Sequence, residues 1–149
     1  MGIIEWDEYF SEIAKTASKR SNCIRAQVGA VIVAPDRTIR STGYNGVPSK
    51  VTSCMERGEC YRVKHDIESG TRYETCRSIH AEQNAIIQAG LARSTGCSMY
   101  IWGHQMICIL CKRFIAQSGI EYVYLKKDDK SPIVKVSVDD IRKELDYTQ

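Results

Sequence analysis

The chain has 149 residues, of which 43% are hydrophobic and 26% are charged, and its formal net charge is +3. This length and composition are typical of one ordinary globular domain, and the small charge, with Lys and Arg spread along the chain, argues against a nucleic-acid partner. No apolar run is long enough to span a bilayer, and the first residues carry acids where a secretory signal carries bases, so we expect a cytoplasmic protein without membrane partners.

The first part of the chain predicts a helix followed by a β-hairpin. Apolar residues recur at helical spacing from Trp6 onward, so we expect an amphipathic helix that ends near Lys19. Residues 27–34 are apolar and β-branched, which predicts a strand. A Pro-Asp-Arg turn follows, and residues 38–44 can return as the second arm of a hairpin.

Later in the chain, helical and strand patterns alternate. This alternation predicts parallel strands joined by crossover helices. In chain order we expect a helix at about 80–91, a strand at 97–102, a helix at 108–118, a strand at 120–125, an edge strand at 133–136, and a final helix through 145 with its cap at 137–140.

The region at about 46–78 is polar, charged and far longer than an ordinary connection in a compact domain. We interpret it as a cysteine-rich insertion in a single domain that covers residues 1–149. A closed four-ligand zinc site can order such a segment because it needs no hydrophobic core. We therefore expect a second, structural zinc; the alternative is free thiols in a partly mobile loop. The expected ligands of this second zinc are Cys23, Cys54, Cys60 and Cys76.

Two short motifs supply three zinc ligands and one further carboxylate. In a regular helix His80 and Glu82 would point nearly opposite ways, so they can converge only at a helix start, where Ser78 can serve as the N-cap. Cys108 and Cys111 lie on one face of the first turn of a second predicted helix. The helix dipole there favours thiolate, the form that binds metal.

This donor set is typical of a catalytic metal. Three nitrogen and sulfur ligands leave one position of tetrahedral zinc open, whereas structural sites fill all four. Glu82 can then accept and donate protons beside the metal. The pairing of H-x-E with C-x-x-C is the documented mark of zinc nucleobase deaminases. The alternatives are core thiols with a solvated glutamate, or a non-catalytic zinc- or nucleotide-binding module, which would gain little from Glu82.

Two further stretches stand in register with these motifs: Gln-Val-Gly-Ala-Val-Ile-Val at 27–33 and Thr-Gly-Tyr-Asn-Gly-Val-Pro at 42–48. With them, the chain resembles the deoxycytidylate (dCMP) deaminases of the zinc-dependent cytidine and deoxycytidylate deaminase family from about Trp6 to Leu125. The resemblance implies an α/β fold, the cytidine-deaminase-like three-layer α/β/α arrangement with a mixed five-stranded sheet. It also implies zinc-dependent hydrolysis of dCMP to deoxyuridylate (dUMP) and ammonia, which supplies dUMP for dTMP synthesis.

The resemblance also indicates substrate-binding residues. In the family the Gly-Tyr-Asn-Gly loop contacts nucleotide, so we expect Asn45 at the sugar-phosphate end, with Gly46 allowing close approach of the backbone. Arg25 either binds phosphate as a bidentate fork or lies solvated at the surface. Tyr44 either stacks on the base or packs in the core. Ala81 completes the expected set.

Many members of the family are hexamers, and some are activated by dCTP and inhibited by dTTP. We therefore expect a homo-oligomer acting on a small-molecule nucleotide, with these two triphosphates as candidate effectors. The same zinc and glutamate could instead serve another amino-heterocycle, such as cytidine, guanine or a tRNA base. A polymer substrate would need a basic or aromatic track for flanking nucleotides, and none stands out.

The chain departs from the family pattern just before the C-x-x-C motif. Ile107 stands where the family usually has a proline, which would favour the first turn of the helix. The shape of the substrate pocket therefore does not follow from the resemblance. His104 lies in the preceding loop and either contacts substrate or faces solvent.

Overall fold

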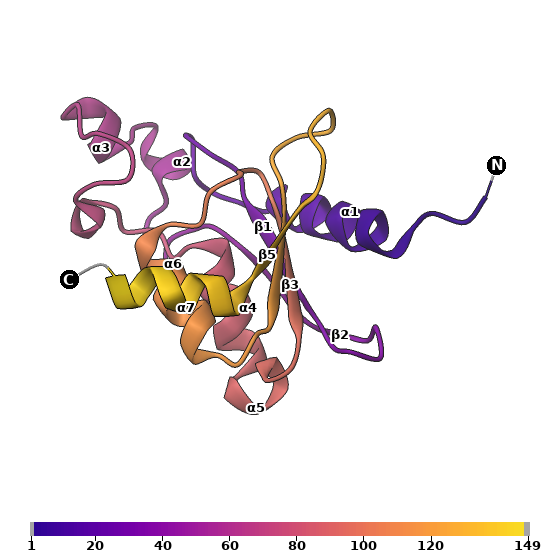
Figure 1. The fold of residues 1–149 in the computed structure, drawn as a ribbon. Helices are drawn as coiled ribbons and strands as arrows, with labels where there is room; N and C mark the ends of the chain where they lie inside the picture. The colour runs from indigo at the N-terminus through magenta and orange to yellow at the C-terminus, as the bar shows by residue number, and fades with distance from the viewer. Residues whose placement is uncertain (1, 148–149) are drawn as a thin grey trace.

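The computed structural model describes residues 2–147 and is built around one five-stranded sheet (Figure 1). Helix α1 (Trp6–Ser18) covers one face of the sheet, and α4, α6 and α7 cover the other. The predicted three-layer α/β/α fold with a mixed five-stranded sheet is therefore confirmed. The strands are β1 (Gly29–Val33), β2 (Ile39–Tyr44), β3 (Ser98–Trp102), β4 (Tyr122–Lys126) and β5 (Val134–Ser137). The later helices are α4 (Ala81–Ala89), α5 (Leu91–Ser94), α6 (Ile109–Gln117) and α7 (Val138–Tyr147).

The sheet has the strand order β2-β1-β3-β4-β5. Strand β1 is antiparallel to both β2 and β3, and β5 is antiparallel to β4. Strands β3 and β4 are parallel and are joined by α6, which confirms the predicted crossover. The predicted hairpin and the predicted edge strand are also present.

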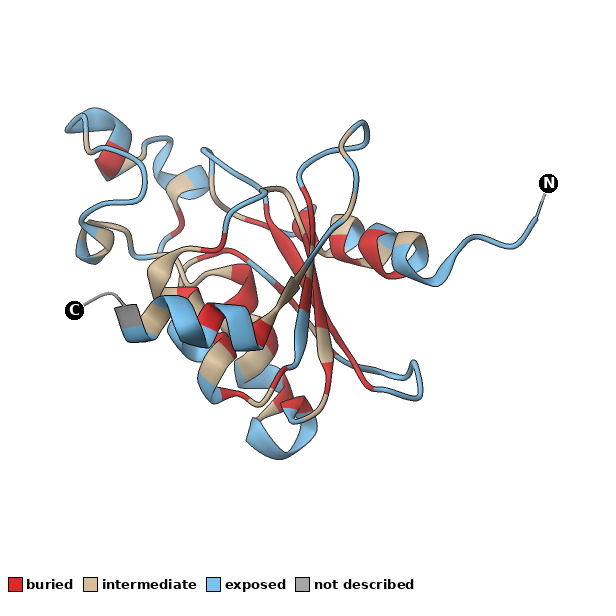
Figure 2. Cartoon of the chain, viewed as in Figure 1, coloured by how far each residue is buried: buried red, intermediate tan, exposed pale blue. Residues whose placement is uncertain are grey.

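The middle strands of the sheet are mostly buried (Figure 2), and their side chains alternate between two cores. Val31, Val33 and Tyr100 pack with Phe10 and Ala14 of α1. Their neighbours in the same strands face the other way, against α4, α6 and α7. All five residues of β1 are buried, as expected for a strand covered on both faces.

Gly43 brings the start of α4 directly against β2. A Cβ atom at Gly43 would collide with the backbone of Ala81 and Ala85. The hydroxyl of Ser41 donates a hydrogen bond to the carbonyl of Ala85 at 2.6 Å, which fastens the same contact. The first turn of α4, which carries the metal-site residues, is therefore fixed to the sheet.

The predicted N-cap of this helix is wrong by two residues. His80 is the N-cap, with extended backbone at φ −72° and ψ 155°, and Ser78 lies before the helix. The cause is a bridge between Gly46 and Ile79, whose backbone N–H groups donate to each other's carbonyls at 3.1 and 2.7 Å. This pairing keeps the chain extended up to the residue before His80.

The cysteine-rich segment forms short helices on the side of the sheet that α4, α6 and α7 cover (Figure 1). They are α2 (Cys54–Arg57), α3 (Tyr61–Lys64) and the 3-10 helix η1 (Tyr73–Thr75). The buried guanidinium of Arg62 ties the segment together, donating to the carbonyls of Arg72 and Glu68 at 2.6 and 2.8 Å and to the hydroxyl of Thr75 at 2.8 Å. Across residues 2–147, no helix combines the length and apolar character needed to cross a membrane.

Candidate metal centre

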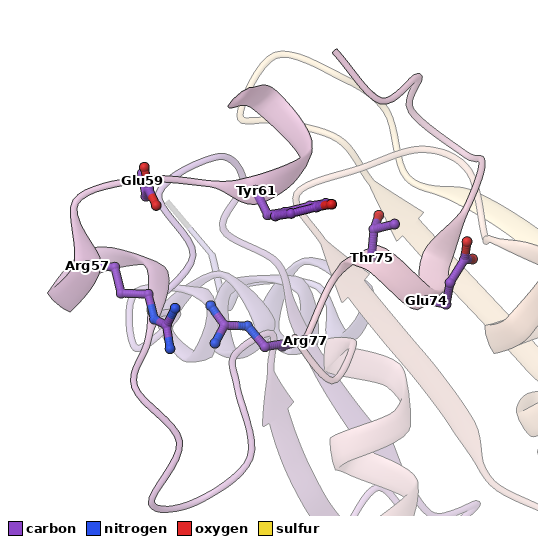
Figure 3. Close-up of a pocket in the computed structure, with 6 residues that line it drawn as sticks. All are labelled: Arg57, Glu59, Tyr61, Glu74, Thr75 and Arg77. Atoms are coloured by element: carbon purple, nitrogen blue, oxygen red, sulfur yellow. The ribbon is translucent and has the colours of Figure 1, made fainter. Parts of the chain in front are cut away.

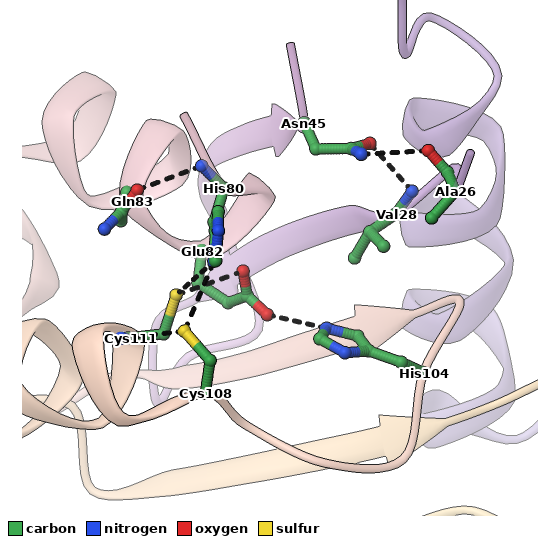
Figure 4. Close-up of polar contacts among 9 residues, drawn as sticks. All are labelled: Ala26, Val28, Asn45, His80, Glu82, Gln83, His104, Cys108 and Cys111. Carbon is green, nitrogen blue, oxygen red and sulfur yellow. Dashed lines mark hydrogen bonds and ion pairs between the residues drawn. The ribbon is translucent and has the colours of Figure 1, made fainter. Parts of the chain in front are cut away.

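The first two predicted site residues lie at the start of α4. His80 is the N-cap and Glu82 is the second residue of the helix, and both side chains reach the sulfur atom of Cys111 (Figure 4). Their convergence depends on the extended backbone of His80, as the sequence predicts. The backbone N–H of His80 donates to Oε1 of Gln83 at 2.9 Å, which holds the cap in place.

Cys108 and Cys111 approach from the start of α6. Cys108 is the N-cap of that helix, and its Sγ accepts from the backbone N–H of Cys111 at 3.4 Å. Nδ1 of His80 lies 3.3 Å from each of the two sulfur atoms. The three ligand atoms lie within 4.8 Å of one another. Residues 2–147 contain no second group of three His, Cys, Asp or Glu side chains whose ligand atoms lie this close together.

The donor atoms fit a zinc ion in spacing and in charge. Tetrahedral zinc with its usual bond lengths separates a nitrogen and a sulfur ligand by roughly 3.5 Å, close to the distances here. Hydrogen bonds from Cys111 and His80 lower the pKa of Cys108 to about 4, whereas the neighbouring Cys108 and burial raise the pKa of Cys111 far above its ordinary value. Two thiolates this close repel each other, and a divalent cation between them removes that penalty.

Glu82 lies beside this centre and is only 1% exposed. Its Oε2 lies 3.5 Å from Sγ of Cys111, and its Oε1 lies 2.9 Å from Nε2 of His104. Burial acts to raise the pKa of Glu82, but the hydrogen bond from His104, helped by its charge and that of His80, holds the pKa below its ordinary value. His104 therefore contacts the carboxylate, a role that neither sequence-based alternative anticipated.

Tyr73 also belongs to this site, although no motif or spacing pointed to it. Its ring lies edge-on to the imidazole of His80, with ring centroids 5.8 Å apart. Burial raises the pKa of Tyr73, and the nearby sulfur of Cys108 raises it further. Tyr73 lies in a polar stretch without periodicity, so only the fold brings it to the metal centre.

The predicted substrate residues occupy varied environments. Asn45 is largely buried, and its side chain links two backbone groups, accepting from the N–H of Val28 and donating to the carbonyl of Ala26, both at 2.9 Å (Figure 4). Gly46 pairs with Ile79, and the side chain of Asn22 fills the space beside it. Tyr44 and Arg25 are exposed, so Tyr44 does not pack in the core. Ala81 is fully buried at the first position of α4.

The four cysteines predicted to bind a second zinc gather around Cys54. Burial raises the pKa of the Cys54 thiol, and the neighbouring thiols of Cys60, Cys23 and Cys76 raise it further, whereas the charge of Arg77 lowers it. These sulfurs do not form a group as tight as that of His80, Cys108 and Cys111.

A pocket of about 360 Å³ lies in this segment, and its lining includes the chain neighbours of Cys60 and Cys76, namely Glu59, Tyr61, Thr75 and Arg77. The guanidinium groups of Arg57 and Arg77 point toward each other across it (Figure 3). Arg57 belongs to α2, which begins with Cys54, and Arg77 directly follows Cys76 in the chain.

Comparisons with known proteins agree with this geometry. Residues 4–127 match the family model described as "Cytidine and deoxycytidylate deaminase zinc-binding region". The chain is 42% identical over 118 residues to the deoxycytidylate deaminase of Schizosaccharomyces pombe, covering 79% of this chain but only 36% of that relative. It is 38% identical over 129 residues to the deoxycytidylate deaminase of Mycobacterium phage D29, covering 83% of this chain and 96% of the phage protein.

Solved structures lead to the same family. The structure of dCMP deaminase from the cyanophage S-TIM5, in complex with dCMP and dUMP, is similar with a TM-score of 0.61 and 29% sequence identity. That match covers 84% of this chain and 83% of the phage chain. This chain thus spans about a third of the fission-yeast relative but nearly all of the Mycobacterium phage protein.

Proposed function

Because this chain belongs to the cytidine and deoxycytidylate deaminase family, we propose that it hydrolyses dCMP to dUMP and ammonia and so supplies dUMP for dTMP synthesis. The observation that carries the proposal is the buried carboxylate of Glu82 beside three atoms that fit zinc. A closed structural zinc site would gain nothing from such a carboxylate. The choice of dCMP is supported by the phage relative, which this chain matches over nearly its whole length.

In this proposal Glu82 moves the protons. When His80, Cys108 and Cys111 hold zinc, the metal supplies a Lewis acid with one open coordination position. Glu82 accepts one proton from the attacking water and passes it to N3 of the cytosine ring. It then takes the second proton from the new C4 hydroxyl and gives it to the amine, so that the C4–N bond breaks and C4 becomes a carbonyl. Water and dCMP thereby give dUMP and ammonia. The base must lie within hydrogen-bond reach of Glu82 for these transfers.

The phosphate end of the substrate is proposed to contact the first half of the chain. The guanidinium of Arg25 is exposed, and no residue in the described range pairs with it, so it is free to bind two phosphate oxygens. Tyr44 is exposed at the end of β2 and can stack on the base. Asn45 would contribute the second N–H of its side-chain amide, and Ala81 the N–H of the first helical position. The N–H of Gly46 is paired with Ile79, so Gly46 would contribute the second lone pair of its carbonyl.

An absorbance assay on dCMP, cytidylate, deoxycytidine and cytosine, with and without dCTP and dTTP, tests this function. We expect dCMP to react with the highest kcat/KM, because only it carries both the deoxyribose and the phosphate. Turnover of deoxycytidine as fast as dCMP would remove phosphate recognition from the proposal. A deaminase of cytidine would instead react fastest with deoxycytidine, the nucleoside in this set. A deaminase of guanine or of a tRNA base would leave all four compounds unchanged. A non-catalytic module would act on none of them.

A second, structural zinc held by Cys23, Cys54, Cys60 and Cys76 is part of the proposal. The gathering of the other three thiols around Cys54 supports it. Four thiolates with one zinc carry two negative charges, and the guanidinium groups of Arg57 and Arg77 beside α2 would offset them (Figure 3).

We further propose a homo-oligomer, with a hexamer as the form that the family resemblance favours. Leu91 and Phe114, which are 61% and 46% exposed, line an apolar pocket with Ile86 on the outer side of α4–α6, and a second copy of the chain would cover them. Light scattering after size-exclusion chromatography tests this, since Leu91→Asp should reduce the mass. A cytoplasmic location and control by dCTP and dTTP also stay proposals. The seven cysteines, which all lie within the described residues, form no disulfide, which suits a reducing compartment.

A further inference from the structure

The two oxygens of the Glu82 carboxylate have different partners. Oε2 lies on the side of the metal ligands, 3.5 Å from Sγ of Cys111. Oε1 accepts a hydrogen bond from Nε2 of His104 at 2.9 Å (Figure 4). We propose that His104 is a positioning residue for the reaction: it holds Oε1 of Glu82, so that Oε2 stays directed toward the metal centre.

The burial of Glu82 makes this contact important. The side chain of Glu82 is 1% exposed and that of His104 is 34% exposed, so His104 stands on the solvent side of the carboxylate. Without His104, Oε1 would be a buried and charged acceptor that has lost a partner, which carries a desolvation cost. The carboxylate would relieve that cost by rotating toward other donors, and Oε2 would leave its place.

The loop before α6 places His104 by backbone contacts. Gly103 has φ +112°, which favours glycine, and a Cβ atom there would collide with the carbonyl oxygen of Gln27. The backbone N–H of Gly103 donates to the carbonyl of Lys126 at 3.0 Å. These contacts hold the loop between the start of β1 and the end of β4. The side chain of His104 extends from the loop to Glu82.

The kinetic consequence rests on the proposed deaminase function. Because His104 acts through Glu82, its loss should lower kcat and leave KM nearly unchanged. Removal of such a supporting hydrogen bond typically costs about 10–100-fold in activity. His104→Leu keeps much of the volume and removes the donor. His104→Gln keeps an N–H donor near the place of Nε2 and should recover most of the lost kcat.

The matched control is His65→Leu. His65 is an exposed histidine in the cysteine-rich segment, with its ring 4.2 Å from that of Tyr61. This variant should keep kcat and KM. All variants should keep the zinc content of the unsubstituted protein, because His104 does not contact His80, Cys108 or Cys111 in the described hydrogen bonds.

A measurement without turnover separates this inference from the proposed function. The chain has three histidines, so nitrogen-15 labelling of histidine alone gives a simple NMR spectrum of the zinc-loaded protein. His104 should show a proton on Nε2 that exchanges slowly with water, and Glu82→Ala should make that exchange fast while leaving His65 unchanged. This result would support the inference even if no cytosine compound were deaminated.

Three outcomes would overturn the inference. The first is an Nε2 of His104 without a proton in the zinc-loaded protein. The second is a kcat of His104→Leu within about threefold of the unsubstituted enzyme, or equal losses in the Leu and Gln variants, since a positioning donor must distinguish them. The third is loss of zinc in His104→Gln, which would give the residue a role in the metal site itself.

Discussion

The ring of Tyr73 lies edge-on against the imidazole of His80, at an interplanar angle of 67°. Tyr73 belongs to η1 in the cysteine-rich segment, whereas His80 is a ligand candidate at the start of α4. The segment therefore supplies one wall of the metal centre. Substitutions that destabilise this segment should therefore disturb the zinc ligand His80 through its contact with Tyr73.

We predict that Tyr73→Ala weakens zinc binding and that Tyr73→Phe does not. Aromatic pairs contribute about 0.5–1.5 kcal/mol beyond burial, so loss of the ring should weaken zinc retention by up to roughly tenfold. Competition with a coloured chelator measures this. Equal zinc affinity in the Ala and Phe variants would show that the ring contact does not support His80.

Glu82→Gln should keep zinc and lose most activity. The amide is nearly isosteric with the carboxylate but cannot carry protons, and general acid–base catalysis contributes roughly 10²–10⁴-fold. Cys111→Ala, by contrast, removes a metal ligand and should lose zinc as well. Zinc content and the dCMP assay on both variants distinguish these effects. A fully active Glu82→Gln enzyme would contradict the assigned role.

Cys54→Ala should remove one of two bound zinc ions and make the cysteine-rich segment sensitive to protease. Closed zinc sites contribute folding free energy directly, so losing one ligand should unfold the segment that depends on it. Cys97→Ala is the control, because Cys97 is buried in the main core and its thiol contacts the carbonyl of Arg93. One zinc per chain after dialysis, with the segment still protease-resistant, would end the second-zinc proposal.

Arg62→Ala should destabilise the cysteine-rich segment by about 2–4 kcal/mol, since three hydrogen bonds from a buried charge are lost. Hydrogen exchange of the backbone amides in residues 60–76 measures this locally. The exposed Arg20 provides the control, because Arg20→Ala should change stability by less than about 0.5 kcal/mol. Unchanged exchange in Arg62→Ala would mean that other contacts order the segment.

Local patterns were enough to predict most of the fold. The helical spacing from Trp6, the apolar run at 27–34 and the later alternation of helix and strand all correspond to observed elements. The residues of the metal centre were also predictable, because His80 and Glu82 form one close pair at a helix start and Cys108 and Cys111 form another. Such features depend on neighbours in sequence.

Contacts between distant segments were not predictable. The helix cap fell at His80 instead of Ser78 because Gly46, far earlier in the chain, pairs with Ile79. The contacts of Tyr73 with His80 and of His104 with Glu82 likewise join separate segments without any periodic signal. The sequence placed His104 in the loop before α6, but not the direction in which its side chain points.

The most direct test of the central claim is the reaction of dCMP with the zinc-loaded protein in water enriched in oxygen-18. We predict dUMP with one oxygen-18 atom at C4 and one ammonia per dUMP, formed by the unsubstituted protein and almost absent with Glu82→Gln. Zinc-loaded protein that leaves dCMP unchanged, or product formation that is equal in the Glu82→Gln variant, would contradict the account.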